Sequence, residues 1–214
     1  MNKKDIFILP NGIKDNLSNK EFEKIIQERK KNKKLQLLFL SNMIETKGPL
    51  DVLYICNELK KKKIEFECSF VGKFQDSNFE KKFFKELNSL NLERECKYLG
   101  PKYGKEKFKI LEKTNYLIFP TTYPEETFGL VIIESFMYGI PALSYDNASI
   151  KEIILNKKLG YVSKKGDWEN ISKELIKRIK KVESSKEIRE EFKKKYLLDN
   201  VLKDLKRILR IGKN

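Results

Sequence analysis

Short apolar runs alternate with longer amphipathic segments along most of the chain, and this alternation constrains the fold more than any other feature. Apolar runs bounded by turn residues are typical of buried strands, and the segments between them have helical periodicity. The predicted strands are Leu35–Leu40, Phe66–Val71, Lys97–Leu99, Tyr116–Phe119, Ala142–Tyr145 and Gly160–Val162. The predicted helices are Leu50–Lys62, Asn78–Leu90, Lys105–Lys113, Leu130–Tyr138, Ser149–Leu155 and Asp167–Val182. Strands that alternate with helices predict an α/β fold, a Rossmann-like doubly wound parallel sheet of about six strands with C-terminal helices.

The two ends of the chain have a different pattern. Residues 1–34 form a lead-in, in which we expect a short strand at Phe7–Leu9, a turn at Asn11–Gly12 and a helix at Glu21–Lys34. Residues 35–184 form the Rossmann-like domain, and residues 185–214 form a tail of two helices. The apolar face of that tail needs a partner, which is either its own domain or a surface outside this chain.

The residue types present exclude several kinds of site. The chain has no histidine, so the usual zinc sites and Ser-His catalytic triads are excluded. Cys56, Cys68 and Cys96 are odd in number and form no C-x-x-C pair, so neither a metal site nor a disulfide framework is expected. Free cysteines suit a reducing cytoplasm, and no apolar stretch is long enough to span a membrane.

The formal net charge is +15, and much of the excess lies near the C-terminus, where residues 151–214 hold 20 Lys/Arg against 10 Asp/Glu. Such a surface attracts nucleic acid, anionic lipid or phosphorylated substrates, or is simply solvated. Few aromatic residues lie among the basic ones, so we predict no nucleic-acid partner. The interpretation favoured for this basic excess is a set of simply solvated lysines. The alternative is a peripheral contact with the inner face of a membrane.

The segment Pro120–Gly129 follows a predicted strand and precedes a predicted helix, the position where ligands bind in doubly wound sheets. The backbone amides of Phe128, Gly129 and Leu130 would lie at the N-terminus of that helix, which suits a phosphate group. The alternative is a plain connecting loop.

Glu134 is the only charged residue of the apolar helix that follows this loop, so the helix is predicted to be buried. A buried carboxylate needs a partner. Glu134 is either satisfied by a neighbouring lysine or backbone amide, or it accepts hydrogen bonds from sugar hydroxyls. The sequence pattern favours neither.

The residues from Glu126 to Glu134, with Phe-Gly after the first glutamate and Gly-Ile-Pro after the helix, resemble the E-x7-E signature of glycosyltransferase family 4. Members of that family are retaining enzymes of the GT-B fold. The similarity extends over most of the chain. It includes Leu38–Gly48, which resembles the phosphate-binding loop after the first strand, the Phe70–Gly72 turn, and Tyr98–Pro101, where the family's backbone meets the base.

The resemblance implies a role for each matching residue. Glu134 would accept hydrogen bonds from the ribose hydroxyls, and Glu126 would contact the transferred sugar. Lys47 and the amides of Phe128–Leu130 would hold the diphosphate and stabilise the leaving group. Glu126 and Lys47 are therefore the expected catalytic residues, with no metal and no cofactor.

Two further positions complete the expected donor site. Asn42 stands where the family has an arginine, and an amide brings no charge to the diphosphate. Gly100 belongs to the segment expected at the base.

The resemblance implies a donor domain that binds a nucleotide-diphosphate sugar for retaining transfer of a hexosyl group to a glycan or lipid-linked acceptor, as in cell-surface polysaccharide biosynthesis. Leu9–Ile13 resembles the passage just after the family's interdomain linker, so the match begins where the second domain begins. We therefore expect a further domain or a partner chain to bind the acceptor. The alternative is a non-catalytic module that binds nucleotide sugars or another protein.

Overall fold

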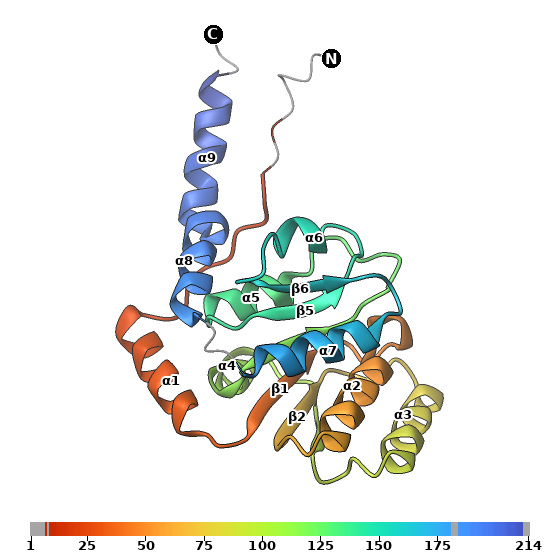
Figure 1. Ribbon diagram of the computed structural model, residues 1–214. Helices are drawn as coiled ribbons and strands as arrows, with labels where there is room; N and C mark the ends of the chain where they lie inside the picture. Colours follow the sequence, from red (N-terminus) through yellow and green to blue (C-terminus); the bar gives the residue numbers. More distant parts are fainter. Residues whose placement is uncertain (1–6, 8, 181–183, 212–214) are drawn as a thin grey trace.

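The computed structural model describes residues 7, 9–180 and 184–211 of the 214-residue chain. Its centre is a six-stranded sheet in the order β3-β2-β1-β4-β5-β6, with all neighbouring strands parallel (Figure 1). The strands are β1 (Leu35–Leu40), β2 (Phe66–Val71), β3 (Cys96–Gly100), β4 (Tyr116–Phe119), β5 (Ala142–Tyr145) and β6 (Gly160–Ser163). The predicted Rossmann-like α/β fold is confirmed.

The central strands are mostly apolar because both of their faces are covered. Every residue of β4 and of β5 is buried. β1 pairs with β2 over six residues, from Leu35 opposite Phe66 to Leu40 opposite Val71. This continuous burial explains why strand positions could be predicted from apolar runs alone.

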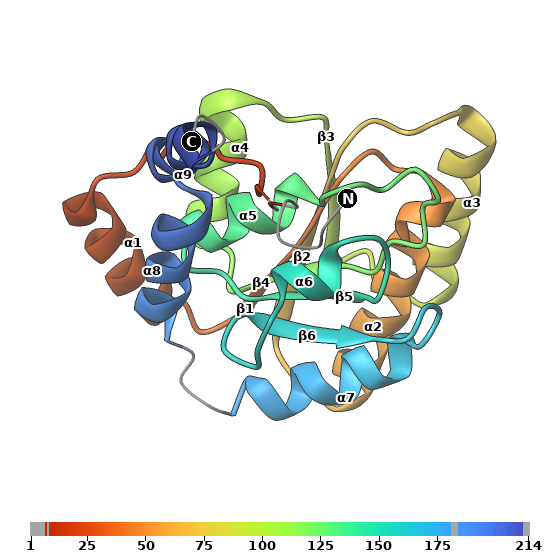
Figure 2. The same cartoon turned by 90° about the horizontal axis from the view of Figure 1, so that it is seen from above.

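Helices cover both faces of the sheet (Figure 2). One face packs against α2 (Pro49–Lys61), α3 (Ser77–Ser89) and α7 (Trp168–Arg178). The other face packs against α1 (Asn19–Lys31), α4 (Gly104–Lys113), α5 (Leu130–Met137), the short α6 (Ile150–Ile153) and α8 (Ser185–Tyr196). Each face therefore has its own apolar core.

Several predicted boundaries are wrong. α1 begins at Asn19 rather than Glu21 because Ser18 and Glu21 form a capping box, a sequence signal that went unused. It ends at Lys31, since Asn32 is already extended. α6 is a single turn rather than the predicted Ser149–Leu155. The end of the predicted Asp167–Val182 helix lies outside the described residues, and α7 itself ends at Arg178.

The lead-in pairs with the tail of the chain. Phe7 and Leu9 lie in no strand, so the predicted strand is wrong for these two residues, and the chain makes no turn at Asn11–Gly12. Instead Ile13 forms a parallel bridge with Leu197, in which the Leu198 amide donates a 2.9 Å hydrogen bond to the Ile13 carbonyl. A Cβ on Gly12 would lie 2.9 Å from the Leu198 Cα, so glycine permits this close approach.

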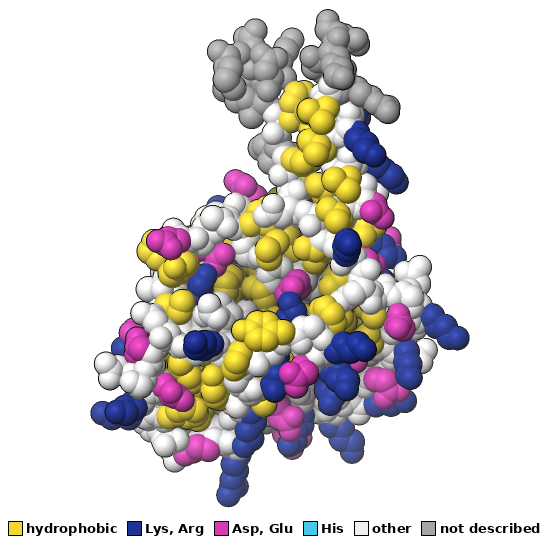
Figure 3. Space-filling view, turned by 180° about the vertical axis from the view of Figure 1, so that it is seen from behind, with side chains coloured by type: hydrophobic (Ala, Val, Ile, Leu, Met, Phe, Trp, Pro, Cys, Tyr) yellow, Lys and Arg dark blue, Asp and Glu magenta, His cyan; other side chains and the backbone are white. Residues whose placement is uncertain are grey.

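The two tail helices differ in burial. α8 buries Ile188, Phe192 and Tyr196 in the core beside α5. α9 (Leu198–Ile211) projects from the body of the molecule (Figure 1). Its exposed leucines are Leu202, Leu205 and Leu209, and Figure 3 shows apolar side chains in a stripe along this helix.

No helix within the described ranges is both long enough and apolar enough to cross a membrane.

Candidate functional site

A cavity of about 310 Å³ lies at the carboxyl ends of the central strands. Leu40, Val71 and Phe119, the last residues of β1, β2 and β4, form part of its wall. The strand order reverses between β1 and β4, and doubly wound sheets bind ligands in the crevice at such a reversal. The rest of the wall comes from loops and from the first turns of two helices: Ser41, Asn42, Lys47, Gly72, Pro101, Lys102, Tyr103, Lys107, Glu126, Gly129, Leu130, Val131 and Glu134.

Lys47 and Glu126 meet in this cavity although they are 79 residues apart. The Lys47 Nζ lies 2.8 Å from the Glu126 Oε2, and the two side chains are only 13% and 10% exposed. The second oxygen of Glu126 accepts a 3.3 Å hydrogen bond from the Gly129 amide. Lys47 also lies 4.0 Å from the centre of the Tyr123 ring, a cation–π distance. The lysine therefore has both a carboxylate and an aromatic face as neighbours.

Contacts between the loop after β1 and the loop after β4 hold this pair in place. Lys47 ends a short 3-10 turn, η2 (Glu45–Lys47), and Gly48 follows it with φ = 83°. A Cβ on Gly48 would lie 2.3 Å from the Pro120 carbonyl oxygen, which no side chain could tolerate. The Thr122 amide donates a 2.7 Å hydrogen bond to the Thr46 carbonyl. The loop after β1 is thus fixed against the loop after β4.

Glu134 forms the second ion pair of the cavity. Its Oε1 lies 2.5 Å from the Lys107 Nζ, and the two side chains are 24% and 22% exposed. The helix is mostly buried, as predicted, but Leu130, Val131 and Glu134 face the cavity. A lysine thus satisfies Glu134, and its binding of sugar hydroxyls stays a prediction.

Lys107, Lys102 and Tyr103 were missed by the sequence interpretation. Lys107 lies on α4 and Lys102 just before it, and both line the cavity. No local pattern distinguishes these lysines from the many others in the chain. Three lysines and two glutamates therefore line the cavity, whereas the sequence predicted only one lysine there.

The loop expected to bind phosphate leads directly into α5. Gly129 is the N-cap residue of this helix, with φ = 60°, and no side chain caps the helix at this residue. The Phe128 ring is directed away, with its centre 6.4 Å from that of Tyr196 on α8. Phe128 itself does not line the cavity, so its contact with a phosphate stays a prediction.

Asn42 lines the cavity, and Gly100 does not. Gly100 ends β3 with φ = 71°, and its carbonyl accepts a 3.2 Å hydrogen bond from the Gly72 amide. A Cβ on Gly72 would lie 1.8 Å from the Ser41 carbonyl oxygen, so glycine here lets the loop that carries Asn42 approach β2. Asn42, Lys47, Glu126, Gly129, Leu130 and Glu134 are thus brought together.

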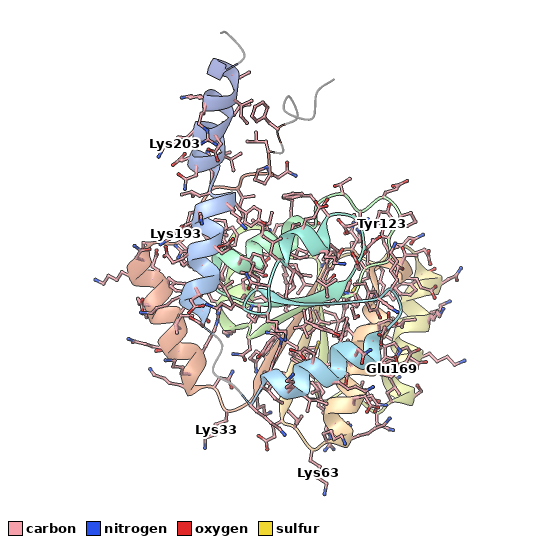
Figure 4. All side chains as sticks on the ribbon, turned by 45° about the horizontal axis from the view of Figure 1, so that its top comes forward. Lys33, Lys63, Tyr123, Glu169, Lys193 and Lys203 are labelled. Carbon is pink, nitrogen blue, oxygen red and sulfur yellow. The ribbon has the colours of Figure 1, made fainter. Side chains whose placement is uncertain are left out.

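Tyr123 stands at the rim of the cavity, and Figure 4 shows it at the opposite end of the molecule from Lys33 and Lys63. Its hydroxyl donates a 2.9 Å hydrogen bond to Glu125, whose carboxylate raises the pKa of Tyr123. The tyrosine therefore stays neutral, with its ring free to face the Lys47 ammonium.

A larger hollow of about 770 Å³ lies at the amino ends of β1 and β4. Its wall includes Lys30, Lys33, Lys34 and Lys186 but none of the predicted site residues. The smaller cavity is the better candidate because it lies at the carboxyl ends of the strands and gathers paired charges.

Comparison with known proteins agrees with the fold and the motif. A family model described as "Glycosyl transferases group 1" matches residues 20–195. No curated protein matches the chain in sequence.

Three solved structures illustrate the structural similarity. A glycosyltransferase from Rickettsia africae superposes with a TM-score of 0.79 at 19% identity, over 100% of this chain and 59% of that one. Anabaena HepE in complex with UDP and glucose gives 0.76 at 16% identity, over 95% of this chain and 56% of that one. The C-terminal domain of a group 1 family protein, LpcC, from Francisella tularensis gives 0.72 at 16% identity, over 87% of this chain and 100% of that one. The chain thus spans little more than half of the first two structures.

Proposed function

The chain belongs to the group 1 glycosyl transferases, and from this premise we propose that it binds the nucleotide-diphosphate sugar of a retaining hexosyl transfer. The acceptor would be a glycan or a lipid-linked saccharide, as in cell-surface polysaccharide synthesis at the inner face of the cytoplasmic membrane. The observation that carries this proposal is the convergence of Lys47, Glu126 and Glu134 on one cavity at the reversal of strand order.

Lys47 would bind the diphosphate together with the backbone amides at the start of α5. A helix N-terminus and an ammonium group both favour an anion, and Gly129 lets the backbone approach closely. Lys47 already contacts Glu126 at 2.8 Å, so a diphosphate would compete for the ammonium group. The lysine would move part of its contact from Glu126 to the phosphate oxygens, which leaves Glu126 able to accept hydrogen bonds from the sugar.

The pair of Glu134 and Lys107 would bind the nucleoside side of the donor. A carboxylate accepts hydrogen bonds from both hydroxyls of a ribose, and Glu134 has its second oxygen outside the contact with Lys107. Lys107 would orient the carboxylate. It would also add positive charge near the phosphates, where Asn42 supplies none.

The transfer step requires the bond between the sugar and the diphosphate to break. Negative charge develops on the leaving diphosphate, and Lys47 with the Gly129 and Leu130 amides would stabilise it. The acceptor would attack from the same face as the leaving group, and binding and positioning would carry most of the rate enhancement. HepE is described with UDP and glucose, so uridine diphosphate sugars are the first donors to test.

A second domain, in the same protein or in a partner chain, would supply the acceptor wall of the site. Phe128, beside the cavity, contacts Tyr196 at the end of α8, so α9 begins next to the cavity and projects beyond it. The exposed leucines of α9 form an apolar face of the kind that proteins cover with a partner surface. The chain also spans only 59% and 56% of the two longer structures above.

The test is calorimetric titration of the chain with UDP, GDP and their sugar conjugates, with Glu134→Ala as the variant. We expect micromolar binding, about −8 kcal/mol, that this variant loses while its circular dichroism stays unchanged. Glu169→Ala is the matched control, because Glu169 is an exposed carboxylate on α7 that does not line the cavity. Equal affinity of Glu134→Ala and the wild type would remove the proposal.

Asn42 favours one alternative, a module that binds nucleotide sugars without turnover, since the neutral amide stabilises a leaving diphosphate less than an arginine would. Release of free nucleoside diphosphate from a bound donor separates the two functions. Release in the presence of short saccharides as acceptors would rule out the non-catalytic module.

A further inference from the structure

Three cysteines that are distant in sequence meet in the core beside α2. Cys56 comes from α2, Cys68 from the middle of β2 and Cys96 from the start of β3. Their sulfur atoms all lie within 4.8 Å of one another, and all three side chains are buried and free. The sequence offered no sign of this cluster, because each thiol belongs to a different element.

We propose that these three thiols form a binding site for one Cu(I) ion. Sulfur ligands select soft cations such as Cu(I). A structural zinc site needs four ligands in a tetrahedron, and the chain has no histidine to complete one. Within the described residues, no carboxylate joins the three sulfurs in the cluster. Three sulfur donors without a fourth ligand fit a cation of low coordination number.

Binding exchanges two thiol protons for one Cu(I) ion. Cu(I) would form bonds to two thiolates, whose two protons leave to solvent, while the third sulfur donates a lone pair as a neutral thiol. The copper is neither oxidised nor reduced, and the complex carries one negative charge.

The position of the cluster suits a structural ion. Cys68 and Cys96 are directly opposite each other in neighbouring strands, and Cys56 lies above them on the helix that follows the Lys47 loop. An ion bound to all three would connect α2 to β2 and to β3, the edge strand of the sheet. None of the three cysteines lines the candidate donor cavity, so this inference does not depend on the proposed function.

The experiment is an anaerobic titration of the reduced chain with Cu(I) in the presence of a competing Cu(I) chelator. It is done once on the folded chain and once during refolding, because the thiols are buried. Native mass spectrometry should show one copper per chain, and the thermal unfolding midpoint should rise because the ion binds only the folded state. X-ray absorption should show three sulfur neighbours.

Cys56→Ala, Cys68→Ala and Cys96→Ala should each lower the copper affinity by a hundredfold or more. Ile55→Val is the matched control, since it removes a buried methyl group from the same core and keeps all three thiols. It should retain one copper per chain even if its unfolding midpoint falls. The proposal is overturned if the wild type takes up no copper by either route, if the cysteine variants bind as well as Ile55→Val, or if fewer than three sulfurs surround the metal.

Discussion

Charged groups are satisfied in different ways on the cavity side of α5 and at its C-terminal end. On the cavity side, Glu126, before the helix, and Glu134, within it, are paired with lysine side chains, and each pair remains partly accessible from the cavity. At its C-terminal end, the arginines Arg29 and Arg189 are almost completely buried. Arg29 donates a 2.9 Å hydrogen bond to the Tyr138 carbonyl, and Arg189 donates a 2.5 Å bond to the Met137 carbonyl.

This difference in partners indicates which charges stabilise the fold and which can bind a ligand. A backbone carbonyl at a helix end cannot leave its position without unfolding that end, so the arginines are permanent partners that satisfy unpaired helix carbonyls. A lysine side chain can turn from a carboxylate to a phosphate with little change in the backbone. Charges at the C-terminal end of α5 therefore stabilise the fold, whereas the lysines on its cavity side can exchange a carboxylate partner for a ligand.

The largest effect should follow the loss of a buried arginine. Arg189→Met removes the 2.7 Å ion pair with Asp15 and the hydrogen bonds to the Met137 and Leu17 carbonyls. Breaking a buried pair from one side costs about 3–5 kcal/mol, so we expect the free energy of unfolding in urea to fall by about that amount. Arg207→Met, on the exposed part of α9, should cost less than about 0.5 kcal/mol. Similar losses in both variants would contradict the structural role of Arg189.

The next effect should be on donor affinity. Lys47→Met removes the charge expected at the diphosphate, and such a charged hydrogen bond is worth about 1.5–3 kcal/mol. Titration with UDP should then show a loss of about tenfold to a hundredfold. Lys82→Met is the control, because Lys82 also pairs with a glutamate, Glu45, but on the exposed surface. A normal affinity in Lys47→Met would show that the diphosphate binds elsewhere.

A smaller effect in the opposite direction should come from Asn42→Arg. Asn42 lines the cavity, and an arginine there would add a cation that can bind a phosphate bidentately. We expect the affinity for UDP to rise about tenfold, near 1.4 kcal/mol. Asn42→Gln, which lengthens the side chain without charge, should leave it unchanged. No gain with arginine would place the phosphates out of reach of this loop.

The smallest effect concerns Asp51, a carboxylate whose partner is neutral. The Tyr145 hydroxyl donates a 2.6 Å hydrogen bond to Asp51, but burial outweighs this bond and raises the pKa of Asp51 above 3.8. The folded chain then holds this proton more tightly than the unfolded chain. As the pH rises from 3.8 through the raised pKa, the free energy of unfolding of the wild type falls. A residue that does not titrate at this position would avoid that loss.

Asp51→Asn should therefore gain stability relative to the wild type between acid and neutral pH. Urea denaturation of both chains at a pH below 3.8 and at neutral pH measures the change in that difference. A difference that does not vary with pH would mean that the Tyr145 hydrogen bond offsets the burial of the charge.

The sequence by itself determined the fold class and the principal carboxylates of the site. Strands covered on both faces are mostly apolar, so β1 and β4 were recognisable from the sequence without any contact being known. Glu126 and Glu134 were found because their spacing and their flanking Phe-Gly and Gly-Ile-Pro residues are local in the chain. Lys47 and Asn42 were found in the same way, from one loop after one strand.

Only the tertiary structure decided which distant side chains meet. Lys107 pairs with Glu134, which is 27 residues away in the sequence. No local pattern distinguishes Lys107 among the 46 arginines and lysines of the chain. Likewise, only the tertiary structure reveals the three-thiol cluster, the two buried arginines and the exposed face of α9. Periodicity depends on neighbours along the chain, whereas the partner of a side chain depends on how the strands and helices are ordered in space.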